Sequence, residues 1–252
     1  NKTTKIIGGI VIVIIIIGGI WYGISKKQTP TEKTIIKIGA ILPLTGDEAY
    51  LGQSAKNAIL LAQSQIPENT KYKYEVIFED DAMDASKTST ALSKLLNIDK
   101  IDAVISFTSG PGNVVSSVTK INKVIHISNA SDSNVAKGDF NFIHWTPPEA
   151  EAKRFAEELK SRNITSIAFI GTQQQGIIAT LDAVKKELAK LKINITVEEL
   201  VQPGTRDFKT VISKVKQSNP QIISMELFSP ELEVLAKQMK EMGVDVPLTT
   251  IE

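Results

Sequence analysis

The chain has 252 residues, of which 42% are hydrophobic and 23% charged, and its 29 basic and 28 acidic side chains leave a formal net charge of +1. This length allows one large domain or two small ones, and the near-neutral charge argues against a nucleic-acid-binding protein. The sequence contains no cysteine, which excludes disulfides, cysteine-ligated zinc, thiol nucleophiles and lipid-bearing cysteines.

An uncharged, isoleucine-rich run from Ile6 to Ile24 predicts a membrane-spanning helix. At about 1.5 Å per residue the run is just long enough for a hydrocarbon core of about 30 Å, and Trp21 and Tyr22 suit the membrane–water interface. A cleaved signal peptide is the alternative, although its apolar region is typically about 7–15 residues long. We expect an anchor or signal segment over residues 1–25 and a polar tether over residues 26–34.

From Ile35 onward, short β-branched runs alternate with amphipathic stretches of helix length, a pattern typical of βαβ units around a parallel sheet. The predicted strands are 37–44, 74–80, 103–107, 124–128, 140–145, 166–171, 196–201 and 222–228. The predicted helices are 50–63, 85–96, 113–123, 149–162, 176–191, 208–217 and 230–242. Ligands of open parallel sheets bind beyond the carboxyl ends of the strands, so the loops at those ends are the candidate sites.

Several of these loops combine small residues with hydroxyl and acidic side chains. They are PLTG at 43–46, EDDAMD at 79–84, SFTSGPG at 106–112 and SNASDS at 128–133. Each stands before a predicted helix, whose free N–H groups favour an anionic ligand group. The same residue types are also the preferred helix caps and turn residues. For Asp80 and Asp81 we expect a local role, with Asp84 as a helix cap.

Enzyme motifs are absent from the sequence: there is no phosphate loop GxxxxGK[ST], no GxGxxG after the first strand, no GxSxG and no HExxH. His126 lies in an apolar strand and His144 stands beside Trp145, so each is expected to be a satisfied core histidine rather than a base or ligand. We therefore expect a binding protein that is not an enzyme and that needs no metal or cofactor.

A set of segments carries a family resemblance. They are IKIGAILPLTG followed by Gly52, FEDDAMDASKTSTA, VISFTSG, HISNAS, AFIGTQQQG and VQPGTRDFKTVISKVKQSNPQII. In this order and spacing the chain resembles the type 1 periplasmic binding proteins of the Leu/Ile/Val-binding kind, the receptors of branched-chain amino acid ABC importers. The resemblance runs from about Ile36 to Glu252. It implies an α/β, periplasmic-binding-protein-like I fold, with two Rossmann-like lobes joined by hinge crossovers and a small solute between them.

The resemblance also implies the domain organisation. Lobe one would cover residues 35–145 and lobe two residues 146–252, with the first crossover at HWTPPEA. Receptors of this family continue past the position of Glu252 and re-enter lobe one, so the resemblance implies that the C-terminal part is missing and lobe one incomplete. On that basis we expect the polypeptide alone to be poorly soluble and to bind weakly.

Ligand contacts would come from both lobes. The resemblance implies Tyr50 (or Leu51), Ser109, Gly110, Ala130 and Ser131 in lobe one, and Gln175, Phe228 and Glu252 in lobe two. Ser109 Oγ and backbone N–H groups would bind a ligand carboxylate, Glu252 would pair with an α-ammonium, and Phe228 would form an apolar or cation–π wall. The residues by themselves leave two alternatives open: Ser109 as a helix cap and Phe228 as a core residue.

Two positions depart from the family pattern. Gln175 stands where a tyrosine is common, and Asp132 stands where a small hydroxyl is expected. A carboxylate at this position would repel the ligand carboxylate unless it pointed away. The sequence therefore predicts an amino acid or a similar small polar solute, such as an amide, a polyol, a peptide-like solute or a differently charged amino acid, without securing leucine, isoleucine or valine.

Two functions follow from the resemblance. The first is an extracytoplasmic receptor, anchored to the cytoplasmic membrane or secreted after signal cleavage, that delivers its ligand to ABC permease subunits. The alternative is a membrane-anchored sensor of the same fold that signals to a partner protein. In both, a ligand that contacts both lobes shifts the population toward the closed form. No nucleic-acid partner is expected.

Overall fold

The computed structural model describes residues 33–68 and 70–251. The predicted membrane segment and Glu252 lie outside this part of the chain. Residues 36–68 and 74–251 belong to one compact unit and the few other described residues to a second. Among the described residues, no helix is both long and apolar enough to span a membrane.

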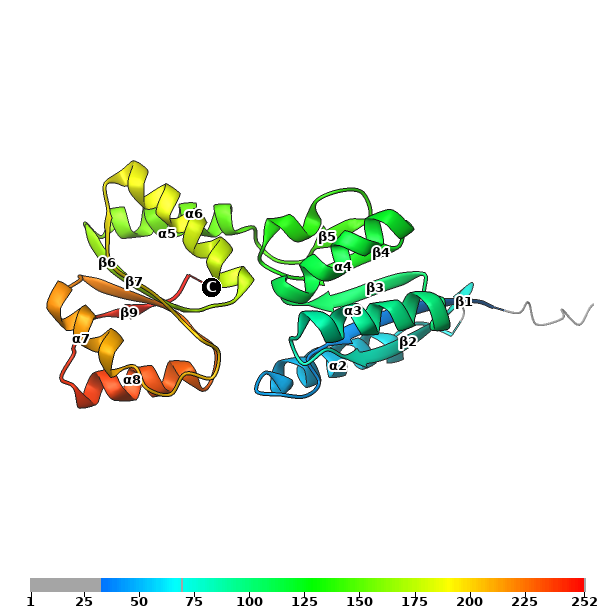
Figure 1. Ribbon diagram of the computed structural model, residues 1–252. Helices are drawn as coiled ribbons and strands as arrows, with labels where there is room; N and C mark the ends of the chain where they lie inside the picture. The colour runs from blue at the N-terminus through cyan, green and yellow to red at the C-terminus, as the bar shows by residue number, and fades with distance from the viewer. Residues whose placement is uncertain (1–32, 69, 252) are drawn as a thin grey trace, which may run out of the picture. The chain divides into compact units, whose positions relative to one another are not determined.

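The first of two sheets has five strands in the order β2-β1-β3-β4-β5, and β1, β3, β4 and β5 pair in parallel. The strands are β1 (Thr34–Leu42), β2 (Tyr72–Asp80), β3 (Ala103–Phe107), β4 (Ile125–Asn129) and β5 (Asn141–Ile143). The helices between them are α2 (Ala49–Ser64), α3 (Ala85–Lys94) with a π turn (Leu95–Asp99), α4 (Ser109–Asn122) and a 3-10 helix (Ser133–Ala136). We call this sheet and its helices lobe one. Its core lies where α3 and α4 cover the sheet (Figure 1).

The second sheet has four parallel strands in the order β7-β6-β8-β9. The strands are β6 (Ser166–Thr172), β7 (Asn194–Val201), β8 (Ile222–Glu226) and the short β9 (Leu248–Thr249), and the helices are α5 (Pro148–Ser161), α6 (Gln175–Leu191), α7 (Lys209–Ser218) and α8 (Glu231–Glu241). We call this part lobe two. Helices α5 and α6 cover one face of its sheet and α7 and α8 the other (Figure 1). Because both faces are covered, every residue of β6 after Ser166 is buried.

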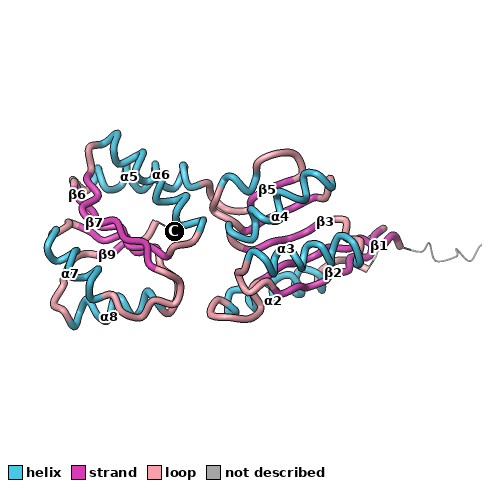
Figure 2. The backbone as a smooth tube through the Cα atoms, viewed as in Figure 1, coloured by secondary structure: helices cyan, strands magenta, loops and turns pink. Residues whose placement is uncertain are grey.

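The predicted alternation of strands with helices and the predicted parallel α/β class are confirmed. Loops join the end of one element to the start of the next (Figure 2). The helix predicted to begin at residue 113 begins earlier, at Ser109. Its first turn is Ser-Gly-Pro-Gly, a poor helix former, yet Ser109, Pro111 and Gly112 are buried there, so tertiary packing overrides propensity. Strand β9 was not predicted. The lobe boundary between residues 145 and 146 stays a prediction.

The acidic residues at the end of β2 and in the loop that follows it have the expected local role. Asp84 caps α3 by accepting a hydrogen bond from the backbone N–H of Lys87 at 2.8 Å. Asp80 accepts from the backbone N–H groups of Leu44 and Thr45 at 2.8 and 3.2 Å. These bonds hold the loop after β1 against the end of β2.

The two histidines differ. His126 is fully buried, with Nε2 2.8 Å from Ser106 Oγ and Nδ1 3.0 Å from Asn141 Oδ1, which confirms a satisfied core histidine. For His144 the prediction is wrong, because its side chain is exposed. It follows the last residue of β5, Ile143, where the chain leaves the sheet, and only its backbone N–H is held, by Ser128 O at 2.8 Å.

Candidate functional site

The loops after β3 and β4 meet because these parallel strands end side by side, with Phe107 opposite Asn129. Thr108 N–H donates to Asn129 O at 2.9 Å. Thr108 has φ 67° and ψ 164°, a region that is essentially restricted to glycine, and such strain persists where the surrounding structure fixes the backbone. This strained turn carries the chain from β3 directly into the first residue of α4.

Ser109 is that first residue, and its side chain joins the two loops. Its Oγ accepts a hydrogen bond from the backbone N–H of Asp132 at 3.0 Å and lies 3.5 Å from Ser131 Oγ. The N-cap of α4 is Thr108, so the alternative of Ser109 as a cap is wrong. Each hydroxyl has one proton to donate, and in this pair one hydroxyl donates to the other, so the pair still offers one hydroxyl proton to an oxygen of a ligand.

The carboxylate of Asp132 does not stand free beside these hydroxyls. Its Oδ1 accepts from the backbone N–H and the side-chain Nδ2 of Asn134, at 2.9 and 2.8 Å. Its Oδ2 accepts from Asn113 Nδ2 at 2.9 Å. The side chain is buried and caps the 3-10 helix. The predicted repulsion of a ligand carboxylate is therefore reduced by amide donors around Asp132.

The other residues predicted in lobe one lie at the start of α4, in the loop after β4 and at the start of α2. Gly110 is the second residue of α4, with open space at the position a Cβ would occupy, and Ala130 is buried after β4. Tyr50 lies in the first turn of α2 and is 46% exposed. Burial raises the pKa of its phenol, while the backbone of Ser229 acts in the opposite direction. Tyr50 therefore faces the loop that follows β8.

In lobe two the predicted residues differ in their surroundings. Phe228 is partly buried and packs on the cluster formed by Phe169, Ile177 and Leu181, so the core alternative accounts for part of its surface. Gln175 is exposed and starts α6, and its Oε1 accepts from Asn113 Nδ2 at 2.7 Å. Glu252 lies outside the described residues. The residue before it, Ile251, donates its backbone N–H to Glu226 Oε1 at 3.0 Å.

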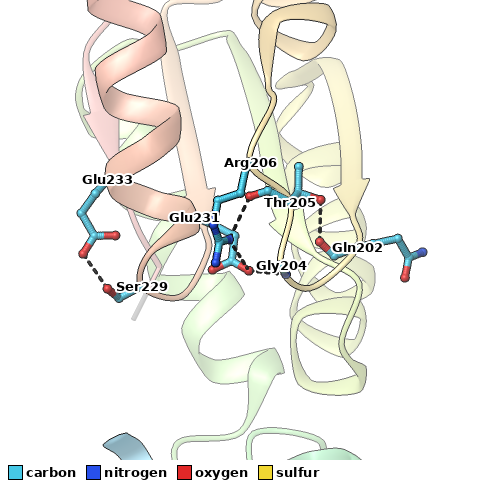
Figure 3. A network of polar contacts seen from close by, with 7 residues as sticks. All are labelled: Gln202, Gly204, Thr205, Arg206, Ser229, Glu231 and Glu233. Carbon is cyan, nitrogen blue, oxygen red and sulfur yellow. Dashed lines mark hydrogen bonds and ion pairs between the residues drawn. The ribbon is translucent and has the colours of Figure 1, made fainter. Parts of the chain in front are cut away.

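A second polar network in lobe two ties the turn after β7 to the start of α8 (Figure 3). The buried carboxylate of Glu231 accepts from Gly204 N–H at 2.6 Å and lies 3.8 Å from Arg206 Nη1. Ser229 Oγ donates to Glu233 Oε1 at 2.7 Å.

The charge of Glu231 also acts on Glu48, the N-cap residue of α2 in lobe one. Burial of Glu48 and the negative charges of Asp47 and Glu231 raise the pKa of its carboxyl group, although a backbone hydrogen bond opposes this.

Sequence reasoning missed Asn113 and Gly176. Asn113 links Asp132 to Gln175, and a Cβ at Gly176 would lie 2.5 Å from Ser131 Oγ. Both stand near predicted residues, but no local motif marks such contacts between distant segments.

Two open surface hollows, of about 430 and 490 Å³, lie elsewhere, along α3 and between β7 and α7. Neither is lined by a predicted site residue.

The sequence matches known proteins over nearly all of the described part. The family model described as "Periplasmic binding protein" matches residues 35–251. A Leu/Ile/Val-binding protein of Rhizobium johnstonii is 26% identical over 235 residues, which cover 89% of this chain and 63% of that protein. A leucine-, isoleucine-, valine-, threonine- and alanine-binding protein of Pseudomonas aeruginosa is 26% identical over 227 residues, 83% of this chain and 58% of that protein. The chain thus spans about three fifths of the length of these relatives.

Solved structures show the same fold. The leucine-binding protein LivK of Thermotoga maritima aligns with a TM-score of 0.79 at 17% identity, over 85% of this chain and 63% of its own. LivJ of Streptococcus pneumoniae, a branched-chain amino acid transporter substrate binding protein solved with isoleucine, aligns with a TM-score of 0.77 at 21% identity, over 86% and 64%. Fold, residue order and family match agree with the resemblance in the sequence. The chain belongs to the type 1 periplasmic binding proteins related to the Leu/Ile/Val-binding proteins.

Proposed function

We propose that this chain is the solute-binding receptor of an ABC importer and that it binds an amino acid or similar small polar solute between its lobes. The observation that carries the proposal is the pair of hydroxyls, Ser109 and Ser131, held by the strained turn at Thr108 at the ends of β3 and β4. The names of the first relatives, both amino-acid-binding proteins, support the ligand class. The receptor needs no cofactor and performs no chemistry.

In this proposal Ser109, Ser131 and the backbone N–H groups around Gly110 and Ala130 hold the ligand carboxylate. Glu252 pairs with an ammonium group, and Tyr50 and Phe228 flank the ligand. Hydroxyl and backbone donors suit a carboxylate because each contributes a hydrogen bond to a charged acceptor. The protein acts outside the cytoplasm, with residues 1–25 as its anchor or signal segment and with 35–145 and 146–252 as its lobes.

The sensor alternative uses the same ligand and the same closure. Genes for a permease and an ATPase beside this one support the importer. An adjacent kinase or chemoreceptor gene supports the sensor instead.

Calorimetry with the full chain and a panel of amino acids and their amides tests the proposal. We expect at least one amino acid to bind, and Ser109→Ala to raise its Kd about 10- to 100-fold, because a hydrogen bond to a charged group contributes about 1.5–3 kcal/mol. The matched control is Ser117→Ala, an exposed serine of the same helix whose Oγ donates to Val114 O at 2.7 Å. Binding of none of the panel would contradict the proposal.

A further inference from the structure

Helices α4 and α6 contact each other at their first turns, beside the proposed carboxylate site. Asn113 Nδ2 donates to Gln175 Oε1 at 2.7 Å and to Asp132 Oδ2 at 2.9 Å. An amide nitrogen has two protons, so both are engaged: one within lobe one and one across to lobe two. Gln175, expected to contact the ligand, is here bonded to the other lobe.

Gly176, the next residue of α6, explains how the two helices come so close. A Cβ at this position would lie 2.5 Å from Ser131 Oγ, closer than real Cβ atoms come to a neighbour, and 3.0 Å from Ser109 Oγ, a tight contact, so at least the Ser131 hydroxyl would have to turn away. Gly176 is not among the residues with positive φ, so its backbone does not require glycine. In a helix, alanine is more favourable than glycine by about 1 kcal/mol. The glycine is therefore explained by the approach to Ser109 and Ser131 rather than by the helix itself.

We propose that Asn113, Gln175 and Gly176 form a latch that holds the two lobes together over the bound solute. This inference rests on the proposed receptor function and deepens it, because it assigns Gln175 to closure instead of ligand contact. A bond that forms only when the lobes meet stabilises the closed form relative to the open one, so it raises the apparent affinity. Its loss acts mainly on the dissociation rate, as most changes at one interface do.

A double-mutant cycle measures the latch. With L-leucine, L-isoleucine and L-valine as probes and stopped-flow kinetics as readout, Asn113→Ala and Gln175→Ala are each expected to raise Kd roughly 2- to 12-fold through faster dissociation. The double variant is expected to show no larger rise in Kd than the more affected single variant, because both substitutions remove the same hydrogen bond. The controls are Asn122→Ala at the other end of α4 and Gln217→Ala on α7, both exposed. Fold-changes that multiply in the double variant would overturn the latch.

Cross-linking tests the contact without any ligand. Because the chain has no cysteine, Asn113→Cys with Gln175→Cys introduces the only thiols, and a short bis-maleimide is expected to join them. Asn122→Cys with Gln217→Cys is the control pair and is expected to stay unlinked. Adding Gly176→Ala is expected to slow the cross-link at least several-fold while α6 keeps its helicity by circular dichroism.

The two proposals fail in different ways. If none of the three amino acids binds but the first cysteine pair cross-links and Gly176→Ala slows it, the latch stands and the ligand assignment is wrong. If an amino acid binds but the cysteine pair does not cross-link, the latch is wrong and the receptor stands.

Discussion

Replacing Gly52 with alanine is expected to destabilise the protein by roughly 2–5 kcal/mol. Gly52 is the one buried residue of α2, and its Cβ would lie 2.0 Å from the carbonyl oxygen of Pro43 and 2.5 Å from its carbon. These are backbone atoms, which no side-chain rotation can move away. Either α2 or the loop after β1 has to shift, and the loop is bonded to Asp80 through Leu44 and Thr45.

Urea denaturation of the wild type and two variants measures this effect. Gly110→Ala is the matched control for stability, because it also introduces a methyl group near the start of a helix but meets nothing within 4 Å. An unhindered alanine is expected to leave the free energy of unfolding unchanged or to raise it by up to about 1 kcal/mol. If Gly52→Ala lowers the free energy of unfolding and Gly110→Ala does not, the result supports the close approach of α2 to the backbone of Pro43. A Gly52→Ala protein as stable as the control would contradict this prediction, because it would show that the loop after β1 shifts at little cost in free energy.

The strand ends and the loops between them were predictable because buried parallel strands read as β-branched runs. Two neighbouring runs, now β3 and β4, end in hydroxyl-rich loops, and parallel strands place these ends together. The family resemblance had implied that Ser109 and Ser131 contact one ligand, and the pairing of β3 with β4 gives the physical reason why they lie close. The helix start at Ser109 was not predictable from propensity, because packing of the buried first turn outweighs the glycines and the proline.

The environment of charged and amide side chains was harder to predict. From the sequence, the carboxylate of Asp132 is expected to repel a ligand carboxylate. The structure shows that the side-chain amides of Asn113 and Asn134 donate hydrogen bonds to it. The bond between Asn113 and Gln175 joins residues 62 positions apart. Such contacts depend on how two helices approach each other, which periodicity and local motifs do not encode.

Acid is expected to weaken the fold through His126. Burial lowers the pKa of this imidazole from 6.5 to about 4, and the hydrogen bond to Asn141 only partly opposes it. Between these pH values the unfolded chain takes up a proton that the folded protein does not, so the free energy of unfolding falls as the pH falls. The difference corresponds to about 3 kcal/mol, present above pH 6.5 and lost by about pH 4.

Urea denaturation of wild type and His126→Gln from pH 7 to 4 isolates this contribution, because glutamine does not titrate. The free energy of unfolding of the variant is expected to fall by about 3 kcal/mol less over this pH range than that of the wild type. The comparison is needed because burial raises the pKa of Asp81, which favours the folded state as pH falls and acts against His126 in the wild-type curve. His144→Gln is the matched control, since it replaces a histidine whose side chain is exposed. If His126→Gln folds poorly, the imidazole resonance of His126 in the wild type is the second measurement, and a midpoint near pH 6.5 would contradict the prediction.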